Sequence, residues 1–249
     1  MKNLGRKLSV IMPAYNEESC IFEAVQETIK TLQESLNLDY EIIVVDDGSN
    51  DGTYQVLRKI AQKSDKVKVV KLNSHYGKGL ALKQGFKSVR GDLVGFLDAD
   101  LDLHPRQLGS FLRMMERTGS DVVIGSKRHP ESRSNYPKRR RMLSFLYHLI
   151  VCLLFGLPIT DTQVGLKLFK YQVLEKVFPK LLVKAYAFDL ELLANARRLG
   201  YKVVEAPITL NFDRETRWGR IGLRDIRNML IDTLAIFYRM YILKYYDKH

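Results

Sequence analysis

The sequence predicts an α/β fold with a mostly parallel central sheet and helices on both of its faces. Short apolar segments of the kind that form buried strands alternate with segments whose apolar residues recur every three or four positions, as on one face of a helix. This alternation runs through most of the chain, which is typical of strand–helix–strand units with parallel pairing. At 249 residues, the chain is long enough for one sizeable core.

Four strands are expected in the first hundred residues, and three of them end in polar loops. They cover residues 8–12, 40–45, 67–72 and 93–97. The helices between them are marked by apolar residues at helical spacing, namely Ile21, Val25, Ile29, Leu32 and Leu36, then Val56, Leu57, Ile60 and Ala61, then Leu80, Ala81, Phe86 and Val89. Because parallel strands end at the same edge of a sheet, the loops after these strands should lie close together.

The second half continues with a helix after Pro105, a strand at 121–125, a loop at 133–141 and a last strand at 201–207. The apolar segment 142–157 follows the basic run 138–141 and is too short to span a bilayer, so it is either a core helix or a helix in the membrane interface. Residues 225–246 are expected to form one amphipathic helix on the membrane, on the catalytic domain or on another subunit. We therefore expect a catalytic domain at 1–215, and a mobile basic loop with an amphipathic helix at 216–249.

The chain is strongly basic, with 40 Lys and Arg against 28 Asp and Glu and a net charge of +12. Such a charge points to an anionic partner, which is a nucleotide, a nucleic acid or a membrane surface. A basic membrane- or nucleic-acid-binding protein without enzyme activity is one alternative, but the basic residues cluster beside apolar segments and not among stacking aromatics, so no nucleic acid is expected. Two cysteines form neither a disulfide framework nor a metal motif, which favours the cytosol, with peripheral contact to the cytoplasmic face of the membrane.

Polar side chains follow three of the first four strands, and they are the first candidates for a site. They are Tyr15 and Glu17, Asp47, and the pair Asp98 and Asp100. A nucleotide suits this set, because Tyr15 can pack against a base and Asp47 can accept a hydrogen bond from the base or ribose. Asp100 can hold a divalent cation on a diphosphate, since Mg²⁺ prefers carboxylate and phosphate oxygens. Neither a P-loop nor a dinucleotide-binding glycine motif is present.

Three ordered motifs resemble those of family-2 glycosyltransferases with the GT-A fold. They are Pro13-Ala14-Tyr15-Asn16-Glu17, Val45-Asp46-Asp47-Gly48-Ser49 and Asp98-Ala99-Asp100. The resemblance covers residues 8–212 and implies an inverting transferase that uses a nucleotide-diphosphate sugar and Mg²⁺ or Mn²⁺.

The family pattern also implies roles for individual residues. Nucleoside binding falls to Pro13, Tyr15, Glu17, Val45 and Asp47, and diphosphate binding to Asp98, Ala99 and Asp100. Asp100 is the expected metal ligand, joined by Asp102 where relatives often have glutamine. Lys78 and Arg128 are the expected cations near the donor, and the sequence leaves open whether Lys127 or Arg128 faces it.

Two later motifs resemble polyprenyl-phosphate sugar transferases, most closely the dolichyl-phosphate β-glucosyltransferases. They cover residues 161–169 and 187–193. Asp98, Asp100 and Asp189 are the expected catalytic residues, with Asp161 as an alternative to Asp189; at most one of Asp189 and Glu191 should enter the site. Arg214 and Arg220 match the spacing of a basic pair that binds the nucleotide sugar in dolichyl-phosphate mannose synthases.

These motifs together predict a metal-dependent, inverting transfer of a hexose to a polyprenyl phosphate at the membrane surface. The hexose is glucose or mannose, and the donor is UDP-glucose or GDP-mannose. A phosphate acceptor is already an anion and needs no strong base, whereas a hydroxyl acceptor needs a carboxylate base. Transfer to a glycan hydroxyl in cell-envelope polysaccharide synthesis is the alternative, and a homodimer is a possible assembly.

Overall fold

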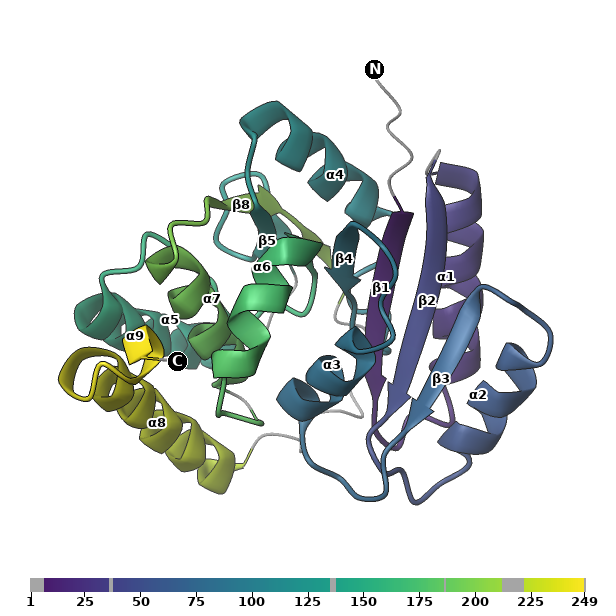
Figure 1. Ribbon diagram of the computed structural model, residues 1–249, viewed down its shortest axis with the longest axis horizontal. Coiled ribbons are helices and arrows are strands. Elements are labelled where there is room, and N and C mark those ends of the chain that lie inside the picture. The colour runs from purple at the N-terminus through teal and green to yellow at the C-terminus, as the bar shows by residue number, and fades with distance from the viewer. Residues whose placement is uncertain (1–6, 36–37, 135–137, 186, 212–221, 249) are drawn as a thin grey trace.

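The computed structural model describes residues 7–35, 38–134, 138–185, 187–211 and 222–248. Its centre is a seven-stranded sheet with the order β3-β2-β1-β4-β7-β5-β8 and helices on both faces (Figure 1). The strands of this sheet are β1 (Lys7–Ala14), β2 (Asp39–Asp46), β3 (Val67–Lys71), β4 (Leu93–Phe96), β5 (Val122–Ser126), β7 (Lys167–Lys170) and β8 (Val203–Pro207). A second, two-stranded sheet consists of β6 (Arg133–Ser134) and β9 (Thr209–Leu210). The predicted α/β class and the mostly parallel sheet are confirmed.

The helices divide between the two faces of the sheet. On one face lie α1 (Ile21–Ser35), α2 (Thr53–Ala61) and α4 (Gln107–Thr118). On the other lie α3 (Lys78–Phe86), α5 (Lys138–Phe155), α6 (Tyr171–Val177) with the short helix η1 (Phe178–Lys180), α7 (Phe188–Arg198) and α8 (Leu223–Phe237). Side chains alternate between the two apolar cores along each strand, so that Val10 and Ile42 face the first set of helices and Ile11 and Ile43 the second.

Parallel pairing brings the predicted loops together. In β1, Ala14 is level with Asp46 of β2, and Ile11 is level with Phe96 of β4. These three adjacent strands therefore end at one edge of the sheet, and the loops that follow them carry the motifs selected from the sequence. The expected convergence of these loops is confirmed.

One strand of the central sheet, β7, was not expected. It lies between β4 and β5 and is antiparallel to both. Because its direction is reversed, its first residue, Lys167, pairs with Phe96 at the end of β4 and so reaches the edge where the parallel strands end. Its four residues follow a polar motif and carry no periodicity long enough to show a strand.

The C-terminal segment differs from the single helix expected at 225–246. Helix α8 ends at Phe237 and continues as a π-helix, η3 (Tyr238–Ile242), after which the chain turns at Lys244 with a φ of 50° and forms α9 (Tyr245–Lys248). This turn lets Tyr246 fold back into the core. The expected loop at 133–141 is shorter as well, because α5 already begins at Lys138. The predicted domain boundary at 215/216 lies outside the described residues.

Among the residues that the structure describes, no helix is both long and apolar enough to cross a bilayer.

Candidate active site

The loop after β2 is held by Asp47, whose carboxylate is buried. Its Oδ1 accepts a hydrogen bond from the Tyr76 N–H at 3.0 Å, and its Oδ2 accepts one from the Gly77 N–H at 2.8 Å. The Nδ1 atom of His75 lies 2.8 Å from the same Oδ2. The His75 ring also stacks on the ring of Tyr15, with 3.8 Å between the ring centroids. Tyr15 and Asp47, the residues expected to bind a nucleoside, therefore share one neighbour.

The other residues expected to bind the nucleoside line the same edge. Glu17 is buried in the turn before α1, where its backbone carbonyl accepts the Ile21 N–H at 2.8 Å and its Oε2 lies 3.0 Å from Sγ of Cys20. Pro13 and Val45 are paired across β1 and β2. The Val45 side chain packs in the core, so this residue can offer a ligand its backbone alone.

Lys78 and Asp98 form the centre of the site. The Lys78 Nζ lies 2.5 Å from Oδ1 of Asp98, which follows β4. Burial acts to lower the pKa of Lys78, but the carboxylates of Asp98, Asp189 and Asp100 outweigh it and raise this pKa above its ordinary value. On the other side of Asp98, Gly165 leaves room for the carboxylate, because a Cβ at this glycine would lie 1.8 Å from Oδ2 of Asp98.

Asp100 and Asp102 continue the same short loop after Ala99, which is buried. The Asp102 N–H donates to Oδ1 of Asp100 at 3.2 Å, and the Asp102 carbonyl accepts the Asn211 N–H at 3.0 Å. No cluster of three or more His, Cys, Asp or Glu side chains in the described parts of the chain could enclose an ion by itself. The aspartate loop nevertheless offers oxygen ligands only, which fit Mg²⁺ or Mn²⁺ when the phosphate oxygens of a ligand complete the set.

Asp189 pairs with a buried lysine that the sequence motifs did not single out. Lys167, which is 1% exposed, donates from Nζ to Oδ1 of Asp189 at 2.7 Å and also to the Val164 carbonyl. Burial lowers the pKa of Lys167, and the Asp189 carboxylate opposes that effect. Two residues further along α7, Glu191 binds other groups: its Oε2 accepts the N–H groups of Leu182 and Val183. Helix α7 thus brings Asp189 to the site and turns Glu191 away from it.

The two neighbouring cations after β5, Lys127 and Arg128, bind different partners. Lys127 pairs with Asp161, with 2.9 Å between its Nζ and Oδ2. Arg128 reaches α5, where its Nη2 donates to the Ser144 hydroxyl at 3.2 Å and its guanidinium lies over the Phe145 ring, 5.5 Å from the centroid. Lys127 is therefore the cation that pairs with residues 160–166, which we call the polar loop before β7.

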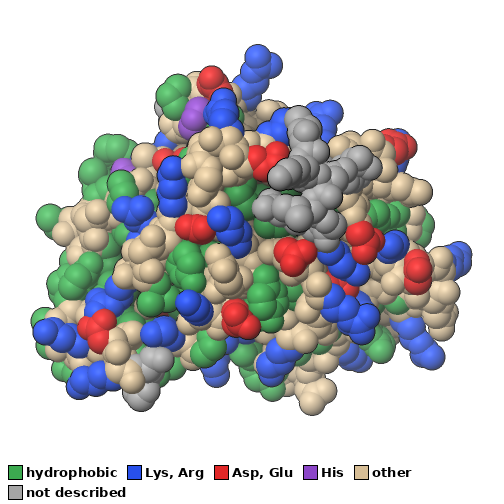
Figure 2. Space-filling view, turned by 45° about the horizontal axis from the view of Figure 1, so that its top comes forward, with side chains coloured by type: hydrophobic (Ala, Val, Ile, Leu, Met, Phe, Trp, Pro, Cys, Tyr) green, Lys and Arg blue, Asp and Glu red, His purple; other side chains and the backbone are tan. Residues whose placement is uncertain are grey.

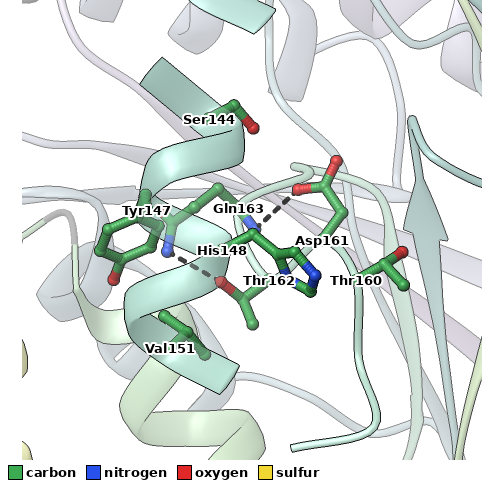
Figure 3. A pocket seen from close by; sticks show the side chains of 8 residues that line it. All are labelled: Ser144, Tyr147, His148, Val151, Thr160, Asp161, Thr162 and Gln163. Carbon is green, nitrogen blue, oxygen red and sulfur yellow. Dashed lines mark hydrogen bonds between the residues drawn. The ribbon is translucent and has the colours of Figure 1, made fainter. Parts of the chain in front are cut away.

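A small polar pocket lies between α5 and this polar loop (Figure 3). It is lined by Ser144, Tyr147, His148, Val151, Thr160, Asp161, Thr162 and Gln163. Both cations contact its lining, Lys127 through Asp161 and Arg128 through Ser144. Ser144 and His148 are polar residues four positions apart in an otherwise apolar segment, which was the signal in the sequence that could have revealed this pocket.

Two ionisable groups of the pocket have pKa values shifted from their ordinary ones. Burial raises the pKa of Tyr147 to about 12, and the Tyr147 hydroxyl lies 3.1 Å from the Thr233 hydroxyl on α8. Burial, together with the charge of Arg128, lowers the pKa of His148. Arg214 and Arg220 lie outside the described residues, as do the side chains of the basic run 138–141.

The family model "Glycosyl transferase family 2" matches residues 9–178, which include the loops after β1, β2 and β4 and the polar loop before β7. The chain belongs to this family. The predicted family, and with it the enzyme class of glycosyltransferase, is confirmed. No observation tests the roles assigned to individual site residues, which stay predictions.

Relatives of this family-2 glycosyltransferase include two curated proteins. Glycosyltransferase AglD of Haloferax volcanii is 29% identical over 95% of this chain, which spans 38% of the relative's length. A dolichyl-phosphate beta-glucosyltransferase of Dictyostelium discoideum is 33% identical over 81% of the chain, and the match covers 65% of the relative. The chain thus spans less than two thirds of the length of these two relatives.

A solved structure confirms the fold. Glucosyl-3-phosphoglycerate synthase from Mycobacterium tuberculosis, in complex with Mn²⁺, UDP and glucosyl-3-phosphoglycerate, superposes with a TM-score of 0.69 at 24% identity. The superposition covers 95% of this chain and 80% of that one.

Proposed function

We propose that this glycosyltransferase moves glucose from UDP-glucose to the phosphate of a polyprenyl phosphate at a membrane surface, with inversion at the anomeric carbon. The observation that carries the proposal is the junction of α5 with the polar loop before β7: Lys127 and Arg128 pair with residues there, Gly165 of the same loop packs on Asp98, and the outer face of α5 is apolar and exposed. The relative from Dictyostelium discoideum, named for transfer of glucose to dolichyl phosphate, supports it.

The donor would lie along the carboxyl edge of the sheet. Tyr15 and Asp47 would bind the nucleoside, and Asp100, with Asp102, would hold Mg²⁺ or Mn²⁺ against the diphosphate. The bound cation would neutralise the charge that develops on the leaving diphosphate. Lys78 places a second positive charge beside Asp98, where a preorganised cation stabilises the same charge.

The acceptor phosphate would bind where the polar loop before β7 meets α5, near Lys127 and Arg128. A phosphate oxygen is a nucleophile without loss of a proton, so an in-line attack on the anomeric carbon needs positioning and no strong base. A hydroxyl acceptor would need a base, and both candidates are already bound to lysines: Asp189 at 2.7 Å from Lys167, and Asp161 at 2.9 Å from Lys127. These ion pairs favour the phosphate acceptor over the hydroxyl acceptor.

Contact with the membrane would come from two neighbouring helical faces. The exposed large apolar residues of α5 are Met142, Leu143, Phe145, Leu146, Leu149 and Leu153. Those of the C-terminal segment, from α8 through η3 to the next residue, are Ile231, Leu234, Tyr238, Tyr241, Ile242 and Leu243. We call this set the apolar surface. Exposed cations border it at Arg224, Arg227 and Lys244. An apolar face with basic residues at its edge suits the interface of an anionic bilayer.

Charges of both signs are mixed on one face of the molecule. On the face shown in Figure 2, lysine and arginine side chains are spread among acidic ones and do not gather into one basic groove. Hydrophobic side chains are numerous toward the left end of that view.

The test is transfer of radioactive sugar to a polyprenyl phosphate in lipid vesicles. UDP-glucose and GDP-mannose are each supplied with Mn²⁺ or Mg²⁺, and the product is extracted into organic solvent. We expect label in the lipid with UDP-glucose, and anomeric inversion by NMR of the product. Label from GDP-mannose would show that the sugar is mannose and not glucose. Transfer to soluble glycans alone would overturn the proposal of a phosphate acceptor. Binding of heparin or RNA without binding of a nucleotide sugar would overturn the proposed transferase activity.

A further inference from the structure

Glu191 is a fully buried carboxylate that the proposed transfer leaves without a role. Its Oε2 accepts the N–H groups of Leu182 at 3.0 Å and Val183 at 2.8 Å. Its Oε1 accepts the hydroxyl proton of Tyr246, and Nη2 of Arg239 lies 3.7 Å from that same Oε1. Burying a carboxylate destabilises the fold unless it is hydrogen bonded, and these partners together offset that cost for Glu191. Glu191 therefore joins the loop before α7 to the C-terminal segment.

The loop side of this junction leads to the centre of the site. The carbonyl of Lys184, one residue after Val183, accepts the Gly79 N–H at 2.8 Å. A Cβ at Gly77 would lie 2.8 Å from the same carbonyl oxygen, so the turn at Gly77–Gly79 packs tightly on this loop. Between the two glycines is Lys78, whose Nζ lies 2.5 Å from Asp98. A shift of the loop would consequently move the cation of the site.

The other side of the junction is anchored by the end of the chain. Tyr246 is 2% exposed and packs in the core formed with α7, and its carbonyl accepts Nζ of Lys180 at 3.1 Å. Arg198 at the end of α7 pairs with Asp247. The same C-terminal segment carries Ile242 and Leu243 on the apolar surface. One face of this segment thus contacts the catalytic domain while the other is exposed.

We propose that Glu191 and Tyr246 are positioning residues, through which the C-terminal segment holds the loop 181–185 and, with it, Lys78 in place for transfer. This inference rests on the proposed function and assigns part of the active-site geometry to a segment that lies outside the site. The segment that faces the proposed membrane surface therefore also sets the position of the cation beside Asp98. No proton transfer by Glu191 is involved.

The test compares Tyr246→Phe with the matched control Tyr201→Phe. Tyr201 donates its hydroxyl to the Gln172 carbonyl at 3.4 Å, and neither residue belongs to the loop 181–185 or the C-terminal segment, so the control removes one tyrosine hydroxyl hydrogen bond elsewhere. We expect kcat for glucose transfer to fall about tenfold in Tyr246→Phe, because small misplacements of catalytic groups are costly. The Kd for UDP with Mn²⁺, measured by calorimetry, should change less than about twofold, because Asp47 separately holds the start of the turn through the N–H groups of Tyr76 and Gly77.

A second variant, Glu191→Gln, keeps an oxygen for the two backbone N–H groups and changes the partner of Tyr246. We expect the double variant Glu191→Gln/Tyr246→Phe to lose no more kcat than the worse single variant, since both act through one contact. Equal losses in kcat and in UDP affinity, independent losses in the double variant, or wild-type kcat in Tyr246→Phe would overturn the inference. Absence of transfer by the wild-type chain would instead overturn the proposed function.

Discussion

The ammonium group of Lys78, at the start of α3, lies 2.5 Å from Oδ1 of Asp98, the first residue of the aspartate motif after β4. Two separate segments therefore place opposite charges side by side at the carboxyl edge of the sheet. If this cation stabilises the leaving diphosphate, Lys78→Met should lower kcat about 100-fold, the usual effect of removing one preorganised donor. Lys59→Met, at an exposed lysine on α2, should leave kcat unchanged in the same assay. A wild-type kcat in Lys78→Met would remove Lys78 from the donor site.

Asp100 is the residue expected to hold the metal. Asp100→Ala should lower transfer at saturating Mn²⁺ by at least about 100-fold, since metal stabilisation of the transition state amounts to several kcal/mol. Circular dichroism should show an unchanged fold, and Asp65→Ala, at an exposed aspartate, serves as the control. Metal-dependent turnover that survives in Asp100→Ala would refute the metal site.

Gly165 tests how closely the polar loop packs against the aspartate motif. A Cβ at this position would lie 1.8 Å from Oδ2 of Asp98, so Gly165→Ala must displace that carboxylate. We expect weaker binding of UDP with Mn²⁺ and a loss of stability of about 1–3 kcal/mol, as in other overpacked sites. In Gly95→Ala the new Cβ would approach nothing closer than a Leu108 methyl at 3.3 Å, so nucleotide binding should be kept. Equal nucleotide affinity in both variants would contradict the close packing.

The apolar surface predicts binding to lipid vesicles. Leu146→Glu/Leu153→Glu places two charges on exposed positions of α5, of which Leu153 is 86% exposed. Each buried leucine is worth about 1.5–3 kcal/mol, so the double variant should stay in the supernatant when wild-type protein sediments with vesicles of phosphatidylcholine and phosphatidylglycerol. Phe22→Glu, at an exposed phenylalanine on α1, should sediment like wild type. A homodimer through this surface would appear instead as a monomer–dimer shift without vesicles.

Tyr147 predicts a pH dependence of stability. Its pKa is raised from 10.0 to about 12, so the folded state keeps its proton where the unfolded state loses it. The stabilisation is complete below pH 10 and is lost as the pH rises toward 12, with a slope of about 1.4 kcal/mol per pH unit. Urea unfolding between pH 8 and pH 11 should therefore show a shallower decline in Tyr147→Phe than in wild type. Parallel declines would show that Tyr147 titrates normally.

The donor half of the site could be predicted from the sequence for a geometrical reason. Adjacent parallel strands end at one edge, so residues directly after them, such as Tyr15, Asp47 and Asp98, must come close together. That rule examines only the residues that follow a strand. It misses Lys167, which reaches the same edge as the first residue of an antiparallel strand.

Other features depended on tertiary packing that periodicity does not encode. The exposed Leu234 and the buried Met240 both belong to apolar stretches of the tail, and the π-helix with the turn at Lys244 decides which of them faces the core. Likewise, the sequence does not show which of Lys127 and Arg128 faces the site. Their directions are set by Asp161 and Ser144, which come from distant segments.

The position of β7 between β4 and β5 also bears on the order in which the site assembles. Strand β4 is flanked by β1 and β7, and both partners come from distant segments of the chain: Leu8 pairs with Leu93, and Phe96 pairs with Lys167. A growing chain that has not yet reached Lys167 would leave one edge of β4 without a partner, and such an edge invites pairing with other chains. The sheet at the centre of the site is therefore closed only once β7 has been made.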